Sequence, residues 1–362
     1  MRTIIANAVM CVLLFVSLKA SAQLTTPRGS QMASVMQRVG TTDITITYSR
    51  PSVNGREVWG KLVPFGMNNL GFGTSTASPW RAGANENTTI TFTHDAKVEG
   101  KAIAAGTYGF HVNVKDTDNA TIILSTDKDA WGSYFYDPDN DALRVDVKLK
   151  DIDYTELLTF DFDEVDKTSA LAALKWEKKA IPFKIEVDVT KIVLDDIRSQ
   201  FKGSTGFTSQ NWEQAANFSL NNGGDLDEAL IWINSALEGQ FFSQKTFNGL
   251  VIKAQILQKK GDLGGFGSTM DEAAKLATPN QINSMGYAMI AAKDYDRALK
   301  YFNMNVKSDP NNANWYDSLG EAYKAKGNHK VAIKHFKKSL SLNPSANVKA
   351  NSEKNLKELG AL

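Results

Sequence analysis

Three neighbouring stretches decide the fold of the first half of this chain: ITITYSRPSVNGREVWG (44–60), LVPFG (62–66) and PWRAGANENTTITFT (79–93). The first begins with Ile44, Ile46 and Tyr48 at alternate positions, which is the period-two pattern of a strand with one buried face. The third ends with the same alternation. Proline, Asn-Gly and Gly-rich turn signals fill the segment between them, so we expect a long excursion that leaves a sheet and returns to it.

Alternation recurs along the chain up to about residue 190, at 108–114, 143–149, 158–162 and 183–189. The segment SALAALKWEKK (169–179) contains strong helix formers but also alternates, and we interpret it as a strand. Many short antiparallel strands with one apolar face each must pair those faces. The sequence therefore predicts an all-β sandwich or jelly-roll-like domain over about residues 24–190.

The excursion is rich in side chains that recognise ligands, and the candidates for binding are Arg50, Arg56, Trp80, Arg81, Asn85 and Glu86. Guanidinium groups beside an aromatic wall suit a carboxylate, a phosphate or a sugar. The alternative is structural, because a long loop needs internal hydrogen bonds whatever its function. In that interpretation the arginines and Glu86 pair with one another and tie the loop to the edge of the sandwich.

Several separated motifs carry a resemblance to a known family: TDITITYSRPSVNGREVWGKLVPFG (42–66), PWRAGANENTTITF (79–92), AGTYGF (105–110), DAWGSYFYDPDNDALRVDVK (129–148) and LKWEKKAIPFKIEVDV (174–189). Together they resemble the domain of unknown function 2911, a family of predicted secreted proteins. The resemblance implies an extracytoplasmic β-rich domain followed by helical repeats, and it brings no established activity. This chain departs from the family by inserting Met67–Ser78.

From about residue 190 the hydrophobic period changes from two to 3.6, which indicates helices. A motif of about 34 residues then repeats, and its clearest copy is Tyr316, Leu319, Gly320, Tyr323, Gly327, Ala332, Phe336 and Pro344. These positions resemble a tetratricopeptide repeat. Earlier copies start near Ile282, Phe247 and Trp212, the second interrupted by a glycine-rich run at 261–267. We expect an all-α tetratricopeptide-like solenoid over residues 191–362, closed by a capping helix at 347–359.

First-helix positions of such repeats line the concave face of a solenoid, which commonly holds an extended peptide or a helix. The candidate partner-binding residues are Asn283, Tyr287, Ile290, Asp317, Glu321 and Lys324. We expect a protein or peptide partner here. The alternative is that the repeats have a purely architectural role.

The first 22 residues have the pattern of a secretory signal peptide, with Arg2, an apolar run from Ala8 to Leu18 and a small-residue end at Ala20–Ala22. The only cysteine, Cys11, lies inside this segment, so we expect a mature protein held together by packing without disulfides. The 41 basic and 40 acidic residues nearly balance, which gives no electrostatic reason to expect nucleic acid. We expect an exported protein, periplasmic or extracellular, without a membrane span after cleavage.

No nucleophile elbow or metal-ligand spacing stands out, and we expect no cofactor and no metal. Asp137, Asp139 and Asp141 have the spacing of calcium ligands, but Lys148 occupies the position that needs a glutamate, so we predict a turn. The leading hypothesis is an exported, non-catalytic scaffold. Its repeats dock a protein and its β-domain contacts an envelope component. The alternative is a carbohydrate-binding or hydrolytic β-domain with its pocket in the 50–86 loop.

Overall fold

The computed structural model describes residues 26–362, and the predicted leader Met1–Ala22 lies outside the described residues. The chain divides into two compact units, which meet in sequence at Val189 and Thr190. We call the first the β-unit and the second the helical unit, and describe each by itself.

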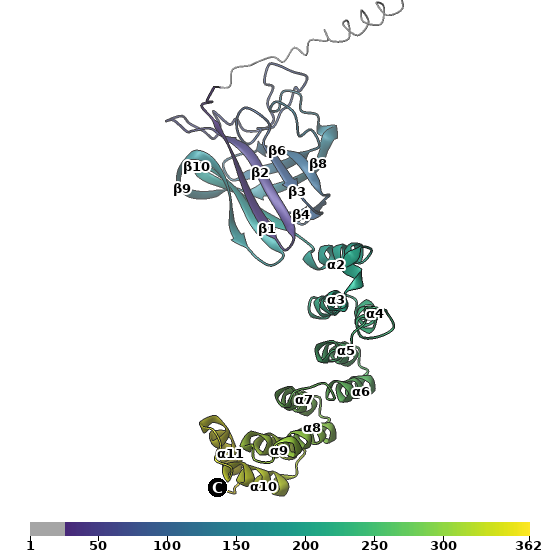
Figure 1. Ribbon diagram of the computed structural model, residues 1–362. Helices are drawn as coiled ribbons and strands as arrows, with labels where there is room; N and C mark the ends of the chain where they lie inside the picture. Colours follow the sequence, from purple (N-terminus) through teal and green to yellow (C-terminus); the bar gives the residue numbers. More distant parts are fainter. Residues whose placement is uncertain (1–25) are drawn as a thin grey trace, which may run out of the picture. The chain divides into compact units, whose positions relative to one another are not determined.

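The β-unit consists of two antiparallel sheets (Figure 1). The six-stranded sheet has the order β1-β2-β3-β6-β7-β8, with β1 (Gln31–Val39), β2 (Thr42–Arg50), β3 (Thr89–Phe92), β6 (Gly106–Val114), β7 (Asn119–Ser125) and β8 (Asp141–Lys148). The four-stranded sheet has the order β5-β4-β10-β9, with β4 (Ala96–Val98), β5 (Lys101–Ile103), β9 (Lys150–Val165) and β10 (Ser169–Glu186). The predicted sandwich class is confirmed, and the ambiguous segment 169–179 is part of a strand.

Aromatic rings fill the space between the two sheets. The ring of Phe110 on β6 lies 5.4 Å from Phe160 on β9 and 5.4 Å from Phe183 on β10. All three side chains are buried, and full burial of a side chain of this size contributes about 1.5–3 kcal/mol. Apolar residues at alternate positions therefore face one another across the sandwich, as the period-two pattern requires.

The hairpin of β9 and β10 is long and irregular. Its register shifts between Leu171 and Ala172, between Lys175 and Glu177, and between Glu177 and Lys179. Glu177 has a positive φ of 55°. A β-bulge bends a strand and re-aims its side chains. The bulge at Glu177 adjoins Trp176, which is buried at the candidate site described below.

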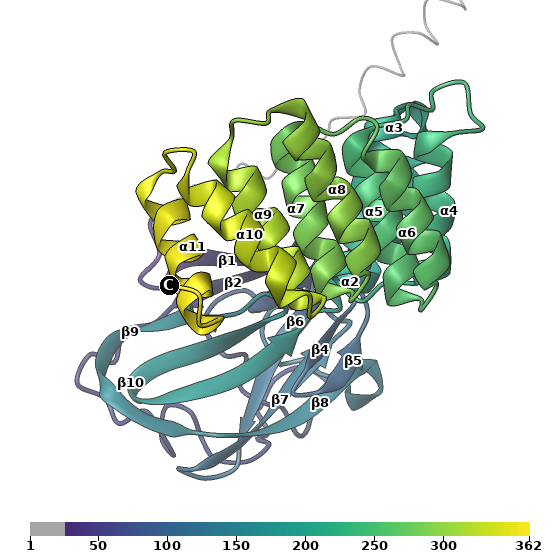
Figure 2. The same ribbon diagram turned by 90° about the horizontal axis from the view of Figure 1, so that it is seen from below.

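The helical unit contains ten α-helices: α2 (Val189–Gln200), α3 (Ser209–Asn221), α4 (Leu226–Leu237), α5 (Phe247–Lys259), α6 (Leu263–Ala273), α7 (Pro279–Ala291), α8 (Tyr295–Ser308), α9 (Ala313–Ala325), α10 (His329–Leu340) and α11 (Ala346–Glu358). The helices α3 to α10 form four consecutive hairpins (Figures 1 and 2). Successive hairpins stack, and α11 packs on the last one. This is the predicted tetratricopeptide-like solenoid.

Glycines let the two helices of a hairpin approach closely. A Cβ atom on Gly286 of α7 would lie 2.4 Å from the Cζ atom of Phe302 on α8. A Cβ atom on Gly320 of α9 would lie 2.7 Å from Cε1 of Phe336 on α10. Both phenylalanines are fully buried. The small and large positions of the repeat motif are therefore complementary partners across the hairpins α7–α8 and α9–α10.

The glycine-rich run at 261–267 does not separate two helices in the way the sequence predicts. Instead α6 begins at Leu263 and includes most of the run. Asp262 caps this helix, because its side chain accepts a hydrogen bond of 2.8 Å from the backbone N–H of Gly265. A Cβ atom on Gly267 would lie 2.2 Å from the Arg297 guanidinium, so the glycine makes room for a neighbouring side chain.

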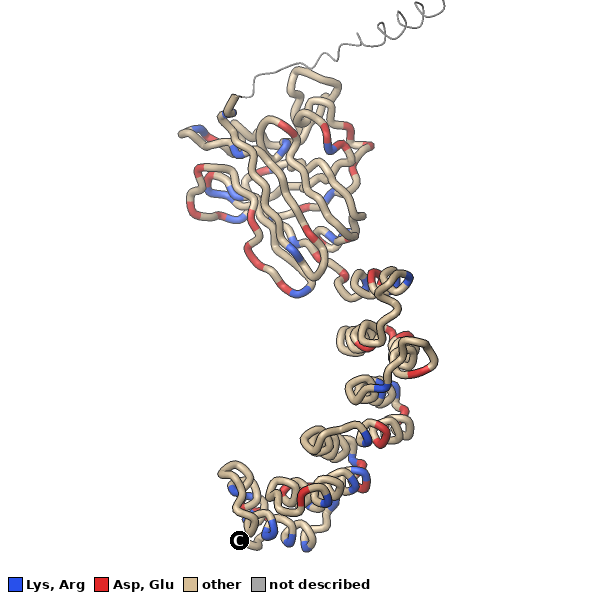
Figure 3. Tube along the Cα trace, in the orientation of Figure 1, with Lys and Arg blue, Asp and Glu red and all other residues tan. Residues whose placement is uncertain are grey.

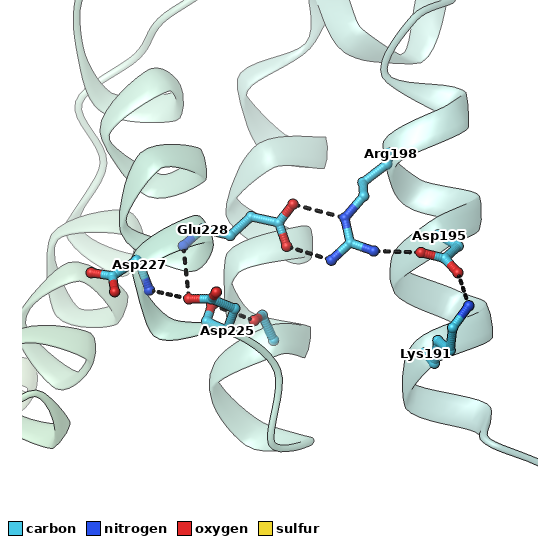
Figure 4. A network of polar contacts seen from close by, with 7 residues as sticks. Lys191, Asp195, Arg198, Asp225, Asp227 and Glu228 are labelled. Carbon is cyan, nitrogen blue, oxygen red and sulfur yellow. Dashed lines mark hydrogen bonds and ion pairs between the residues drawn. The ribbon is translucent and has the colours of Figure 1, made fainter.

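An additional helix, α2, precedes the first repeat and is joined to it by a surface network (Figure 4). The Arg198 guanidinium donates two hydrogen bonds to the Glu228 carboxylate, of 2.8 and 2.7 Å, and a third of 2.5 Å to Asp195. Asp225 caps α4 by accepting from the backbone N–H groups of Asp227 and Glu228. Since these groups are partly exposed, solvent weakens each ion pair and we expect the network to contribute little to stability.

Acidic and basic residues are interspersed along the helical unit (Figure 3). This agrees with the near balance of charges in the sequence. Among residues 26–362, no helix is both long and apolar enough to cross a membrane.

Candidate functional site

The excursion between β2 and β3 is anchored to both sheets of the β-unit. Trp80 exchanges backbone hydrogen bonds of 2.9 and 2.8 Å with Val112 on β6. On the other side, the Leu158 N–H of β9 donates to the Pro51 carbonyl at 3.0 Å, and the Val53 N–H donates to Glu156 at 2.9 Å. A segment that is bonded to both sheets spans one end of the sandwich and holds its side chains in fixed positions.

The insertion Met67–Ser78 closes on itself. Asn68 and Ser78 exchange backbone hydrogen bonds of 2.9 and 2.8 Å at its base. At its tip, the exposed ring of Phe72 lies 5.7 Å from Tyr134 and 5.9 Å from Phe135. The extra residues therefore form a small loop that is closed at its base by the pairing of Asn68 with Ser78.

The excursion covers a cavity of about 390 Å³, a size typical of small-molecule sites. Its aromatic wall consists of Trp80 from the excursion and Trp176 from β10, whose rings stack at 5.9 Å with 14° between their planes. Trp59 packs edge-on against both rings. The remaining lining is Ser30, Pro51, Arg56, Leu62, Val63, Pro64, Asn68, Leu70, Ser78, Pro79, Arg81, Gly83, Ala84, Asn85 and Ser133.

Arg81 is held at the cavity by contacts that leave much of its guanidinium unused. Its Nη1 donates to the Asn85 carbonyl at 2.7 Å, and its Cζ lies 5.2 Å from the centre of the Tyr134 ring. The guanidinium packs so closely on Gly132 that a Cβ atom there would lie 2.4 Å from the Arg81 Cζ. Gly132 also has a φ of 69°, a conformation that favours glycine.

Arg56 reaches the cavity from the turn that begins the excursion. Its Nε donates to the Val53 carbonyl at 3.0 Å and its Nη2 to the Ser52 carbonyl at 2.5 Å. Within residues 26–362, neither Arg56 nor Arg81 forms an ion pair with a carboxylate. The cavity therefore combines two guanidinium groups with a largely apolar wall.

His111 lies behind the cavity. The alternation of β6 predicts an outward-facing residue, but His111 is buried and its Nδ1 lies 3.1 Å from the Ser133 hydroxyl. Burial, and then the positive charge of Arg81, lower its pKa to about 4. The imidazole is therefore neutral at physiological pH. The difference from the expectation arises because the segment 126–140 folds over this face of the sheet, where Tyr136 packs against His111.

The structure separates the six ligand-binding candidates into two groups. Arg56, Trp80, Arg81 and Asn85 line the cavity. Arg50 instead joins the sheets, donating to the Leu158 carbonyl at 2.9 Å and to the Thr159 hydroxyl at 2.6 Å. Glu86 pairs with Arg28, which is outside the excursion. Arg50 and Glu86 thus have structural contacts, but they do not pair with each other as the clamp interpretation expects. Trp176 and Ser133 are cavity residues that the sequence did not indicate.

Asp137 begins a short turn and is not arranged as a calcium ligand. Its side chain accepts from the backbone N–H of Asp139 at 3.0 Å and caps the 3-10 turn η2 (Pro138–Asn140). Asp141 pairs with Arg144. No group of three or more His, Cys, Asp or Glu side chains in the described part of the chain is placed to hold a metal ion.

On the helical unit, the partner-binding candidates of α9 bond to the neighbouring first helices. Asn351 Nδ2 of α11 donates to Asp317 at 2.7 Å, and Lys324 pairs with Glu358. From α7, the Tyr287 hydroxyl donates to Glu321 at 2.5 Å. Each of these three pairs joins residues 34 positions apart. We call this set the ladder, and it connects α7, α9 and α11.

Asp317 is the most buried member of the ladder. It also accepts from the Ser352 hydroxyl at 2.5 Å, so both carboxylate oxygens are occupied. Burial raises the pKa of Asp317, and the hydrogen bonds from Ser352 and Asn351 oppose that rise. A side chain that is only 4% exposed and doubly bonded is not available to a partner, in contrast to the expectation.

Asn283 occupies the same position one repeat before Asp317 but stands outside the ladder. Its Oδ1 is buried and has no hydrogen-bond partner among the described residues. The side chain as a whole is half-buried, and Tyr287, one turn further along α7, is 38% exposed. On the first-helix face, Asp317 of α9 is thus hydrogen-bonded to α11, whereas Oδ1 of the equivalent Asn283 on α7 has no partner among the described residues.

The two units define a β-sandwich domain followed by a helical-repeat domain. Residues 30–185 match the family model described as "Protein of unknown function (DUF2911)", which confirms the predicted resemblance. Residues 313–346 match the tetratricopeptide repeat model. No curated protein matches the chain.

Among solved structures, the chain is similar to a crystal structure of MamA protein, with 15% identity over 42% of this chain and 82% of that one, at a TM-score of 0.33. It is also similar to YrrB, described as a TPR protein with an unusual peptide-binding site, with 16% identity over 46% and 84% of the chains and a TM-score of 0.33. The class of the helical unit rests on the repeat match and on its own stacked hairpins.

Proposed function

We propose that this protein is an exported, non-catalytic scaffold whose helical unit docks a protein partner on the first-helix face of α7. The tetratricopeptide repeat match supports the general role in protein interaction. The β-unit contacts a component of the cell envelope in this proposal. Its support is the predicted leader together with the match to DUF2911.

The observation that carries the docking proposal is the unpartnered amide of Asn283. A buried polar atom without a hydrogen bond costs about 1–3 kcal/mol, and the fold does not relieve this cost at α7. The side chain as a whole is only half-buried, so a partner that packs on this face can reach its amide. The amide can then bond to the backbone of an extended peptide, which offers a donor or an acceptor at every residue.

The neighbouring side chains give the same place an apolar surface. The Tyr287 ring packs edge-on against Phe302 at 5.2 Å while keeping one side exposed, and Ile290 is half-buried one turn later. An interface needs a rigid aromatic anchor beside a satisfied polar contact. Tyr287 is held in place by its hydroxyl bond to Glu321 and supplies that anchor.

Site-specific photo-crosslinking in cells that naturally make the protein tests this mapping. A photoreactive phenylalanine at Tyr287 should crosslink one protein, and the matched control carries the same residue at Lys334, an exposed position of the second helix α10. Asn283→Ala combined with the crosslinker should weaken the product without lowering the Tm. Equal crosslinking from both positions, or none from Tyr287, would contradict the proposed face.

Export is a separate part of the proposal. N-terminal sequencing of the protein recovered from cell fractions should find a mature chain that begins at Gln23 or close to it, outside the cytoplasm. A full-length chain in the cytoplasm would refute export and leave the docking face untouched.

A further inference from the structure

The cavity of the β-unit carries an inference independent of the docking proposal, because it holds positive charge that the protein does not neutralise. A guanidinium has five N–H donors. Arg81 uses only Nη1, and its Nε and Nη2 have no hydrogen-bond acceptor among residues 26–362. Arg56 uses Nε and Nη2 on backbone carbonyls, and its Nη1 has no such acceptor. Donors of this kind, facing a cavity, suit an anion.

The charge around the cavity fits a single negative charge. Glu156 is ionised, since the hydrogen bond from Tyr154 and, more weakly, the charge of Arg56 lower its pKa. It therefore offsets part of the Arg56 charge. Glu86 is paired with Arg28, and His111 is neutral. Of the two cations that line the cavity, Arg81 then has no ion pair with a carboxylate of residues 26–362 and no neighbouring carboxylate that offsets its charge. A single uncompensated charge matches a carboxylate better than a doubly charged phosphate.

The rest of the cavity fits the body of the ligand. Trp80 and Trp176 stack against each other, and Trp80 is the half-exposed member of the pair. Proline and leucine side chains extend this wall: Pro51, Pro64, Pro79, Leu62 and Leu70. A cavity of about 390 Å³ accommodates one or two rings and excludes a long polymer.

We propose that this cavity binds a small organic carboxylate, with its carboxylate on the Arg81 fork and an apolar ring face against Trp80. An aromatic acid and an acidic sugar share this chemistry, since both present a ring face and one carboxylate. Different parts of the chain fix the positions of the Arg81 guanidinium and the Trp80 ring. Gly132 and Tyr134 hold the guanidinium, while the bridge to Val112 holds Trp80.

Calorimetric titration of the full chain with matched pairs of probes tests the proposal. Phenylacetate is compared with phenylacetamide, and galacturonate with galactose, so that each pair differs mainly in charge. The acid of at least one pair should bind roughly tenfold or more tightly than its neutral counterpart, as a charge-assisted contact requires. The pair that responds identifies the ring. Equal binding of acid and neutral probe, or no binding of any probe at about 1 mM, overturns the proposal.

Variants test whether the ligand carboxylate contacts Arg81. Arg81→Gln should weaken the acid roughly tenfold or more and leave the neutral probe unchanged. Arg81→Lys keeps the charge but loses the fork, and Gly132→Ala displaces the guanidinium without removing it, so both should give intermediate losses. Arg50→Gln is the matched control, because Arg50 bonds to β9 outside the cavity.

Thermal melting checks that each variant folds. If Arg81→Gln does not fold, Arg81→Lys and Gly132→Ala take its place in the comparison. Loss of acid binding in Arg50→Gln equal to that in the cavity variants would overturn the assignment to Arg81. Selective binding of inorganic phosphate, with no response to either acid, would also overturn it.

Discussion

The ladder of the helical unit and the cavity of the β-unit use polar side chains in opposite ways. In the ladder, Asp317, Glu321 and Lys324 are bonded to side chains of neighbouring repeats. In the cavity, Arg56 and Arg81 face empty space with unused donors and no ion pair. A polar group that is satisfied within the protein stabilises the fold, whereas an unsatisfied one marks a place where something else can bind.

The difference follows from how each region is assembled. Repeats bring equivalent side chains together at a fixed interval of 34 residues, so each position meets its own counterpart. The cavity combines residues as distant in sequence as Ser30 and Trp176. Its irregular backbone does not place a carboxylate opposite each guanidinium group. Periodicity favours hydrogen bonds between equivalent positions, and Asn283 is the position equivalent to Asp317 at which such a bond is missing.

The largest expected effect tests whether the helical unit behaves as a chain of local contacts. Phe336→Ala should lower the free energy of unfolding by about 3–5 kcal/mol, because the ring is fully buried against Gly320. In a repeat array the loss stays close to its origin. Hydrogen exchange should therefore rise in α9, α10 and α11 and remain unchanged in the β-unit. Faster exchange throughout β6 and β7 would contradict this local behaviour.

The next effect concerns pH and the neutral imidazole behind the cavity. The pKa of His111 is about 4 when folded and close to 6.5 when unfolded, so between these values the unfolded chain binds more protons. The free energy of unfolding therefore has its full value above pH 6.5. It decreases by on the order of 3 kcal/mol as the pH falls towards 4. Denaturant titrations of the protein and of His111→Asn between pH 7 and 4 measure the difference.

One further measurement, and the opposite effect expected of Asp317, make this test specific. Arg81→Gln should raise the pKa of His111, measured by NMR, because it removes the charge that adds to burial. Protonation of Asp317 should have the opposite effect on stability. Burial raises its pKa above 3.8, so the folded chain binds this proton at a higher pH than the unfolded chain does. Acidification through that raised pKa stabilises the helical unit. Identical pH slopes for the protein and for His111→Asn would rule out the imidazole as the source.

A direct comparison of the two regions comes from removing one polar group in each. Asp317→Ala should destabilise the protein by about 1–3 kcal/mol, because it leaves the buried hydroxyl of Ser352 without its acceptor. Arg56→Ala should cost less than about 0.5 kcal/mol, because an exposed guanidinium without an ion pair contributes little to folding. Urea unfolding curves measure both. Equal losses would remove the distinction between ladder and cavity.

The sequence predicted the fold class well where its patterns were periodic. The alternation in β2, β3 and β6 and the repeat motif led to the correct architecture of both units. Four strands were not predicted, namely β1, β4, β5 and β7. β4 and β5 have only three residues each, which is too short for an alternating pattern. β7 is buried along nearly its whole length, so it has no alternation, and β1 is an edge strand with partly exposed residues.

The candidate sites were predictable only in part. Arg56, Trp80, Arg81 and Asn85 were recognisable because they are close together in the sequence. Trp176 was not, because a stacking partner from β10 depends on how two sheets pack. In the helical unit, the repeat period predicted which residues lie on the first-helix face. It could not predict that both carboxylate oxygens of Asp317 accept hydrogen bonds within the protein.

The smallest expected effect tests whether the ladder couples α7 to α9. Tyr287→Phe keeps the ring against Phe302 and removes only the hydroxyl that donates to Glu321, so it should cost about 0.5–1.5 kcal/mol. The double variant with Glu321→Ala should cost less than the sum of the single variants, because each single variant removes the same bond between Tyr287 and Glu321. Additive losses in urea unfolding would mean that the first-helix faces are independent, and that the break in the ladder at Asn283 has no energetic meaning.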